Sequence, residues 1–309
     1  MGTDRVPATA KPGRRRRFSR ATLIVSLCCG LAYPAGAFAE ATVADHTTID
    51  SQDTVIPQPW LDQARGLRVY FGHQSVGDNI LAGLDALARQ RPDRYAIPLQ
   101  REPSRLSLSA LFRSEASNPV RQGGIEHFLV GRNGDPEGKI KDFARRMNER
   151  GKVVDVAMMK FCFVDFPVPR SDPEQLFAHY RDSMERLQKE YPKLRLVWWT
   201  APLTRSDNAQ RNAYNRLVRA YAAANGKPLY DIADIESHDP QGAETLDQDG
   251  PVLYAGYTQD GGHLTAEGQL RAARAWWWLS ARLSGWTGAV VQTGLERNKA
   301  VREETPPSQ

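Results

Sequence analysis

The sequence predicts an α/β protein in which a mainly parallel sheet is covered by helices on both faces. Short apolar runs alternate with segments of helical period over most of the chain. The strongest run, residues 153–161, is apolar almost throughout, which is typical of a strand buried on both faces. Because parallel strands need crossovers between them, this alternation favours one parallel sheet, and we expect about five strands.

The expected elements follow in chain order. A first strand at residues 67–71 leads through a Gly-bounded turn into a helix with apolar residues at helical spacing. Further strands are expected at residues 95–99, 153–161, 194–200 and 229–232. Further helices are expected around residues 140–147, from Ser171, over 206–225 and from Thr265 through Ala281. Residues 101–135 lack a regular period, and we expect an irregular insertion there that walls a pocket.

The first 39 residues have the organisation of a signal peptide. Arg14 to Arg17 precede an uncharged run that ends in the small-x-small triplet Ala37-Phe38-Ala39. The Arg-Arg-x-Phe arrangement is also typical of a twin-arginine signal. An uncleaved membrane anchor is the alternative, since the run is long enough to span a bilayer, although its Gly and Pro residues weaken it as a helix. We therefore expect a periplasmic or secreted protein.

The positive charge of the chain belongs to this leader. The 309 residues carry a net charge of +5, but residues 1–39 hold seven Lys and Arg and one acid, which leaves 34 basic and 35 acidic residues. A nearly neutral body gives no reason to expect nucleic acid binding. Cys28 and Cys29 leave with the leader, and Cys162 alone can form neither an intrachain disulfide nor a Cys-based zinc site.

A single domain is expected over residues 60–286. Residues 40–59 are polar and without periodicity, so we expect a flexible lead-in. Residues 287–309 have little to bury and are expected to form a disordered tail.

Ser75 lies where the first strand, the turn and the helix meet. Such a turn lifts a hydroxyl out of the sheet and directs helix N-terminal amides at whatever binds beside it. The hydroxyl needs a base, and the base needs an orienting group. Asp260-Gly-Gly-His263 offers both, in a loop expected at the same edge of the sheet. We therefore predict an acyl-transfer site of Ser75, His263 and Asp260.

Other interpretations of these residues stay open. Ser75 could be only a helix N-cap, and Asp260 could belong to a plain turn. His73 could line the pocket, bond the turn or replace His263 as the base. A metal site of His73, Asp260 and His263 is a further alternative, but the short-range His pair of common zinc motifs is missing, and we expect no metal or cofactor. Surface positions are expected for His46, His127, His179 and His238, of which His127 is the one to watch because it follows Gly123-Gly124.

The order of these motifs resembles that of the SGNH/GDSL hydrolase superfamily. The resemblance covers residues 65–285 and rests on residues 70–77, 160–165 and 257–264, with Asn212, Asn215 and residues 231–233 in support. It implies a flavodoxin-like three-layer α/β sandwich. It also implies metal-free hydrolysis of esters, often of acetyl groups on carbohydrates or of lipid esters.

Two parts of the family pattern are replaced in this chain. Gly72-His73-Gln74-Ser75 stands where the family has Gly-Asp-Ser-Leu, and nothing matches its Gly-x-Asn-Asp block, which supplies an Asn donor to the oxyanion. We expect the backbone amides of Ser75 and Gly124 to receive the oxyanion, with Asn133, Gln74 or no side chain as third donor. Losing one donor costs about a hundredfold in rate. The candidate pocket residues are His73, Gln74, Asn79, Asn133, Lys160 and Asp165.

The predicted function is that of an exported serine esterase. Its expected substrate is a small-molecule or polysaccharide ester, with acetyl esters on carbohydrates first. The alternatives are an acetyltransferase and a non-catalytic carbohydrate-binding protein on the same fold. We expect no nucleic acid partner and no stable membrane insertion after leader cleavage, and the oligomeric state stays open.

Overall fold

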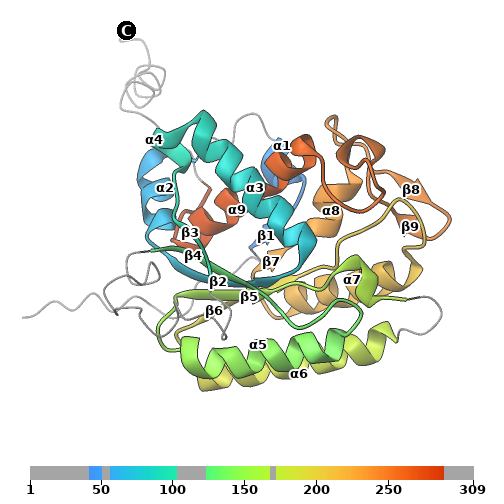
Figure 1. Cartoon of the computed structure of the whole chain (residues 1–309), viewed down its shortest axis with the longest axis horizontal. Coiled ribbons are helices and arrows are strands. Elements are labelled where there is room, and N and C mark those ends of the chain that lie inside the picture. Colours follow the sequence, from blue (N-terminus) through green and yellow to red (C-terminus); the bar gives the residue numbers. More distant parts are fainter. Residues whose placement is uncertain (1–41, 51–55, 103–122, 168–171, 289–309) are drawn as a thin grey trace, which may run out of the picture. The chain divides into compact units, whose positions relative to one another are not determined.

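The computed structural model describes residues 42–50, 56–102, 123–167 and 172–288 (Figure 1). Within them, one sheet has the strand order β1-β7-β6-β5-β2-β4-β3, and every neighbouring pair is parallel. Its strands are β1 (Val43–Ala44), β2 (Arg68–His73), β3 (Leu99–Arg101), β4 (Gly124–Leu129), β5 (Val156–Met159), β6 (Arg195–Trp199) and β7 (Leu229–Tyr230). The series β4-β2-β5-β6-β7 has the flavodoxin-like order. A small antiparallel ribbon joins β8 (Leu246–Asp247) to β9 (Gly250–Pro251).

Helices cover both faces of the sheet, which confirms the predicted three-layer architecture (Figure 1). One face carries α1 (Thr47–Asp50), α2 (Gln58–Arg65), α3 (Ser75–Gln90), α4 (Pro92–Tyr95), α8 (Ile232–Ser237) and α9 (Ala266–Leu283). The other carries α5 (Pro136–Arg150), α6 (Pro173–Glu190) and α7 (Ala209–Ala224). Each layer of helices therefore encloses its own apolar core against the sheet.

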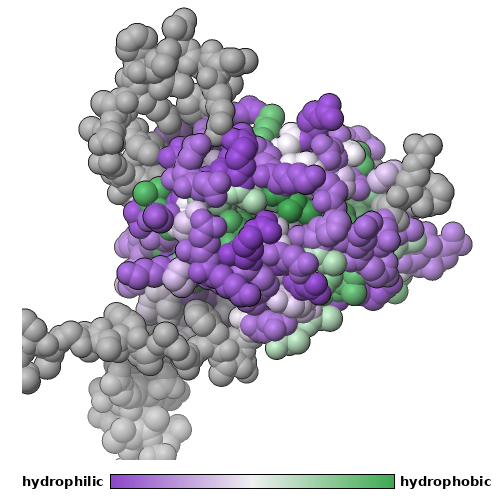
Figure 2. All heavy atoms as spheres, turned by 90° about the horizontal axis from the view of Figure 1, so that it is seen from below, coloured by the Kyte–Doolittle hydropathy of each residue, from purple (hydrophilic) through white to green (hydrophobic). Residues whose placement is uncertain are grey.

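The apolar run at β5 is explained by these two cores. Val156 and Met158 pack into the core under α3 and α9, whereas Ala157 and Met159 pack into the core under α5 and α6. A strand buried on both faces has no solvent side, so its side chains do not alternate in polarity. Seen from below, the face formed by α5 and α6 is mostly hydrophilic with small separate apolar patches, because these helices turn their apolar sides to the sheet (Figure 2).

The helix that starts near Ser171 was predicted within one or two residues. The Asp172 side chain accepts a hydrogen bond from the Gln175 amide at 2.8 Å, and Pro173 occupies the first turn. The same design begins α5, where Asp135 accepts from the Gly138 amide at 2.8 Å. Both caps satisfy amides that the first helical turn leaves without partners.

The expectation of an irregular insertion over residues 101–135 is wrong in its last third. β4 lies there, and it pairs with β2 in the middle of the sheet. The sequence of β4 does not show the apolar run of a buried strand, because the strand contains Glu126, which is buried, and His127, which is half-buried. Glu126 is neutralised by Arg150 of α5, whose guanidinium lies 2.9 Å from its Oε1. Residues 103–122, and with them most of the expected pocket wall, lie outside the described residues.

The start of the folded body also differs from the prediction. Part of the expected flexible lead-in, residues 42–50, is folded, because β1 pairs with β7 and α1 covers one face of the sheet. Likewise, α2 begins at Gln58. The predicted leader (1–39) and almost all of the predicted tail (287–309) lie outside the described residues, among which no helix is long and apolar enough to cross a membrane.

The close approach of α3 and α9 positions the candidate site. Gly83 of α3 faces the backbone of α9, where a Cβ atom would lie 2.1 Å from the Gln269 carbonyl oxygen. Only a glycine permits this spacing. Ser75 begins α3 and His263 precedes α9. The packing of these two helices therefore brings the two predicted loops to one edge of the sheet.

Candidate active site

Ser75, His263 and Asp260 form one hydrogen-bonded series. The His263 Nε2 atom lies 2.8 Å from the Ser75 Oγ atom, and its Nδ1 atom lies 2.6 Å from Asp260 Oδ2. Ser75 is the first residue of α3, directly after β2 and the connecting Gln74. The residues that the sequence singled out at opposite ends of the chain are therefore in direct contact, in the arrangement that activates a serine hydroxyl.

Asp260 orders its own loop as well as the imidazole. Its Oδ1 atom accepts hydrogen bonds from the backbone amides of Gly262 at 3.0 Å and His263 at 2.8 Å. Gly261 adopts a φ of 90°, which favours glycine. The amide and imidazole hydrogen bonds hold the pKa of the Asp260 carboxyl well below its usual value, so the group stays ionised. The same residue thus orders the turn and orients the imidazole of His263.

Neighbouring elements hold the His263 loop in place. Asn79 of α3 accepts a hydrogen bond from the Leu264 amide at 3.0 Å. Phe163, in the turn after β5, contacts the His263 ring edge-on with the ring centroids 5.4 Å apart. The Gly261 carbonyl accepts from the Arg205 amide, in the loop after β6, at 3.0 Å. Asn79 therefore links α3 to the loop that carries His263, and its expected place in the pocket stays a prediction.

His263 and the Asp260 carboxylate that it contacts are open to solvent. The side chains of His263 and Asp260 are 42% and 57% exposed. Such exposure leaves room beside the imidazole for a bulky group attached to a reacting ester.

His73 does not act as the base for Ser75. Its side chain is fully buried, its Nδ1 atom lies 3.0 Å from the Gln74 carbonyl oxygen and its Nε2 atom 2.9 Å from Nδ1 of His127. Burial lowers the pKa of His73 to about 3 and that of His127 to about 4. Of the three roles considered for His73, bonding the turn is the one that the structure places. The surface position expected for His127 is wrong, because this residue is half-buried on β4.

Gly124 is not an oxyanion donor to Ser75, which corrects the prediction. Its amide donates to the Leu67 carbonyl at 2.9 Å, and the residue pairs with Arg68 at the beginning of β2. Ser75 follows the other end of β2. Five strand residues separate the two ends, or about 16 Å at ~3.3 Å per residue. Because no strand was predicted around Gly124, the sequence did not indicate whether this glycine lies at the beginning or at the carboxyl end of a strand.

The Gln74 side chain is also engaged elsewhere. Its Nε2 atom donates to the carbonyl oxygens of Val130 at 2.9 Å and Gly131 at 3.3 Å, in the loop after β4. These bonds join the turn before Ser75 to the loop after β4, and they direct the side-chain amide away from the predicted role of third oxyanion donor.

Asp165 and the buried Lys139 form a polar cluster with Asn133, whose own position is exposed. Asp165 Oδ2 accepts from Lys139 Nζ at 2.5 Å and from the Cys162 amide at 2.7 Å, and its Oδ1 accepts from the Gly134 amide at 2.8 Å. Asn133 Oδ1 accepts from the same Lys139 at 3.1 Å. This cluster ties the loop after β4 to the turn after β5.

Lys160, another predicted pocket residue, is fully buried. Its Nζ atom donates to the Phe161 carbonyl at 3.1 Å, and burial lowers its pKa to about 8. A side chain without solvent access cannot contact a substrate directly. The prediction that Lys160 lines the pocket is therefore wrong.

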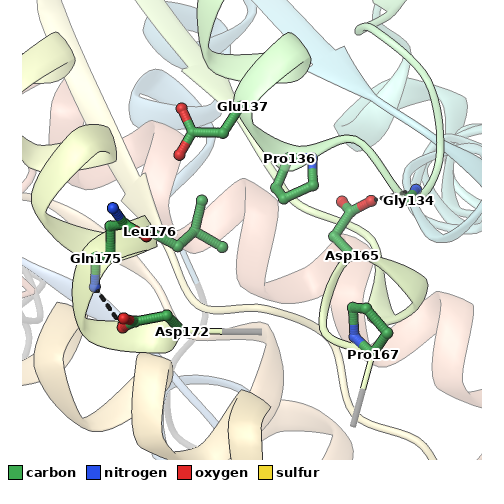
Figure 3. Close-up of a pocket in the computed structure, with 8 residues that line it drawn as sticks. All are labelled: Gly134, Pro136, Glu137, Asp165, Pro167, Asp172, Gln175 and Leu176. Carbon is green, nitrogen blue, oxygen red and sulfur yellow. Dashed lines mark hydrogen bonds between the residues drawn. The ribbon is translucent and has the colours of Figure 1, made fainter. Parts of the chain in front are cut away.

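A pocket of about 240 Å³ lies between the loop after β4 and the start of α6. Figure 3 shows Gly134 and Asp165 on one side of it, and Asp172, hydrogen-bonded to the Gln175 amide, on the other. Ser75, His263 and Asp260 do not line it. The pocket therefore cannot hold the carbonyl that Ser75 would attack.

Two groups of side chains in the described ranges have the composition of a metal site, His46–Asp234–His238 and His73–Asp78–His127. In the first, the imidazole rings stack with centroids 3.5 Å apart and planes within 8° of parallel. Nitrogen lone pairs lie in the ring planes, so two such rings cannot direct them at one ion. In the second, nitrogens of the two imidazoles face each other at hydrogen-bond distance. The geometry of both groups favours hydrogen bonding, and the alternative group of His73, Asp260 and His263 is not assembled.

Comparison with solved structures finds chains of related architecture. A GDSL-like lipase from Bacteroides thetaiotaomicron aligns at 14% identity and a TM-score of 0.43, covering 74% of this chain and 95% of the lipase. A carbohydrate esterase family 3 protein from Talaromyces cellulolyticus aligns at 13% identity and a TM-score of 0.41, covering 67% and 92%. The chain is similar in fold to SGNH/GDSL hydrolases. No family model matches the sequence, and no curated protein matches it. The likeness concerns the fold alone.

Sequence reasoning missed two residues that shape the site. His127 supports His73 from β4, and Phe163 packs against the ring of His263. Phe163 stands in the segment that replaces the Gly-x-Asn-Asp block of the family, which was the only signal for it. His127 could have been found only by recognising β4 as a strand paired with β2.

Proposed function

We propose that the chain is a serine ester hydrolase, with Ser75 as nucleophile, His263 as general base and Asp260 as the group that orients the base. The observation that carries this proposal is the continuous series from Ser75 Oγ through His263 to Asp260, with distances of 2.8 and 2.6 Å. A serine hydroxyl in an ordinary surface turn has no need of a base that is itself oriented by a carboxylate.

The reaction proceeds by acyl transfer. His263 Nε2 removes the proton of Ser75 as the Oγ atom attacks the ester carbonyl, and ionised Asp260 stabilises the imidazolium that forms. His263 then protonates the departing alcohol. Water, activated by the same imidazole, releases the acid from Ser75. The negative charge on the carbonyl oxygen is received by the Ser75 amide, which begins α3 and has no acceptor within the helix. Asn133 remains the side-chain candidate for a second donor.

The proposed substrates are acetyl esters on carbohydrates. The exposure of His263 and Asp260 supports this class, because an open imidazole can serve an ester whose alcohol is part of a long, bulky chain. The proposed leader supports it too, because an exported protein meets polysaccharides outside the cytoplasm.

Turnover of p-nitrophenyl acetate tests the proposed mechanism. We expect Ser75→Ala and His263→Ala each to lower kcat/KM at least about a thousandfold, because residues of such a series act as a unit. Ser284→Ala, at the far end of α9, and His179→Ala, on α6, are matched controls that should keep the wild-type rate.

Three further outcomes complete this test. A rate that survives in both Ser75→Ala and His263→Ala contradicts the proposed triad. Loss of the rate on addition of a chelator contradicts a metal-free mechanism. With acetylated xylan as substrate, acetate release supports the proposed class, whereas acetylation of an added oligosaccharide identifies a transferase.

A further inference from the structure

The peptide that joins Gln74 to Ser75 is held from its carbonyl side. The Gln74 carbonyl oxygen accepts hydrogen bonds from the Gly77 amide at 2.7 Å, the Asp78 amide at 3.4 Å and His73 Nδ1 at 3.0 Å. In a trans peptide, the carbonyl and the N–H of the next residue point in opposite directions within one plane. Whatever fixes the Gln74 carbonyl therefore also fixes the direction of the Ser75 N–H, the proposed oxyanion donor.

The Gln74 carbonyl oxygen determines the direction of the hydrogen bonds that join it to His73 and His73 to His127. A carbonyl oxygen can only accept, so His73 carries its hydrogen on Nδ1. In a neutral imidazole the Nε2 atom is then an acceptor, and the facing Nδ1 of His127, at 2.9 Å, must donate to it. His127 thus holds His73 in the one tautomer that can bond the Gln74 carbonyl.

The His73 ring is packed closely against Gly77 and Phe71. A Cβ atom at Gly77 would lie 2.3 to 2.5 Å from the Cβ, Cγ and Nδ1 atoms of His73, and the ring also stacks on Phe71 with centroids 4.8 Å apart. The charged and titratable groups that face it are Asp78 at 4.0 Å, His127, Lys160 and Arg101. Burial of the ring favours its neutral form throughout the range in which esterases are assayed.

An apolar side chain would fill this position at lower cost. Burying two imidazoles requires that their polar atoms be hydrogen-bonded, since an unpaired buried polar group costs about 1–3 kcal/mol. The series ends on the peptide whose N–H faces the reacting carbonyl. Its placement therefore points to a role in the reaction and not only in folding.

We propose that His73, held in one tautomer by His127, is a positioning residue that aligns the Ser75 N–H as the oxyanion donor. This inference rests on the proposed ester hydrolysis and assigns to two residues outside the triad a share in its rate. It also explains how the turn is ordered without the acid that the family has before its serine.

Paired variants at each histidine test this role with p-nitrophenyl acetate. His127→Phe and His73→Leu remove the donors and should lower kcat about ten- to a hundredfold with KM changed less than about twofold, part of the effect of losing a donor outright. His127→Asn and His73→Asn place an amide N–H where the Nδ1 donor stood and should recover most of that loss. Melting temperatures of all four variants separate activity from folding.

Binding of phenylboronic acid gives a second measurement. Its tetrahedral adduct with Ser75 places an oxygen at the oxyanion position, so its affinity should fall with kcat in His127→Phe and recover in His127→Asn. Equal losses in His127→Phe and His127→Asn, effects on KM alone, or an unchanged kcat in His127→Phe would overturn the positioning role while Ser75→Ala remains inactive. If Ser75→Ala keeps its activity, the proposed function itself fails, and this inference with it.

Discussion

At the scale of single residues, the site depends on side chains that serve two partners at once. Asp260 uses one oxygen for two loop amides and the other for the His263 imidazole. Removing such a residue changes both the loop and the tautomer of the base, so its effect on the rate cannot be divided between them. Gly77 matters for a different reason: the His73 side chain occupies the space in which a Cβ atom of residue 77 would lie.

Gly77→Ala should lower both stability and kcat. Alanine is the better helix former by about 0.5–1 kcal/mol. The new methyl group would overlap the buried His73 side chain, and overpacking of this kind costs about 1–3 kcal/mol. The cost of the overlap should exceed the gain in helix propensity. We therefore expect a lower melting temperature and a reduced kcat, with KM nearly unchanged. Ala82→Gly, on the exposed side of α3, is the control: it loses helix propensity without touching His73 and should not reduce kcat.

At the scale of elements, the site is a meeting of loops at the carboxyl edge of a parallel sheet. Ser75, the proposed nucleophile, follows β2, Phe163 follows β5, and His263, the proposed base, precedes α9. In parallel sheets a crevice forms at this edge where the strand order reverses, here beside β2, because the crossovers on its two sides leave in opposite directions. The strand–turn–helix around Ser75 was predictable, since its pattern is local. The partner strand β4 was not, because its buried Glu126 and half-buried His127 interrupt the apolar pattern.

Asn79 of α3 accepts a hydrogen bond from the loop that carries His263, so substitutions at Asn79 test whether this bond holds the loop in place. Asn79→Ala leaves the Leu264 amide without the acceptor that it has at 3.0 Å, which should cost about 1 kcal/mol of stability and let the His263 loop move. We expect kcat on p-nitrophenyl acetate to fall about tenfold. Asn79→Asp keeps an acceptor oxygen and should stay close to wild type. The same kcat for Asn79→Ala and wild type would show that the loop is held without this bond.

At the scale of the whole molecule, buried ionisable groups link stability to pH. Glu236 of α8 is 1% exposed, accepts from the Leu203 amide at 2.7 Å, and has its pKa raised to about 8 by burial. A carboxyl with a raised folded-state pKa keeps its proton while the unfolded chain loses it. Its contribution is fully present below the unfolded pKa and is lost as the pH rises towards 8. The buried His73 acts in the opposite sense, since its lowered pKa removes stability as the pH falls below about 6.5.

Urea unfolding at pH 6.5 and pH 8 isolates the contribution of Glu236. Between these values the wild-type protein should lose roughly 1–2 kcal/mol through this group, at about 1.4 kcal/mol per pH unit. Glu236→Gln matches the protonated carboxyl in shape and cannot ionise, so its unfolding free energy should change less over this interval. Parallel pH dependence in both proteins would show that Glu236 is ionised in the folded state.

The sequence by itself determined the α/β class, most of the strands and helices, and the pairing of Ser75 with Asp260 and His263. These depend on local period, on turn residues and on the rule that loops after parallel strands gather at one edge. Only the tertiary structure decided that β4 lies beside β2, that Gly124 falls at the far end of that strand, that His73 and His127 bond each other, and that Lys160 is buried. The physical reason is that the pairing of strands and the burial of a side chain depend on contacts between residues far apart in the sequence. The local sequence around a residue does not specify those contacts.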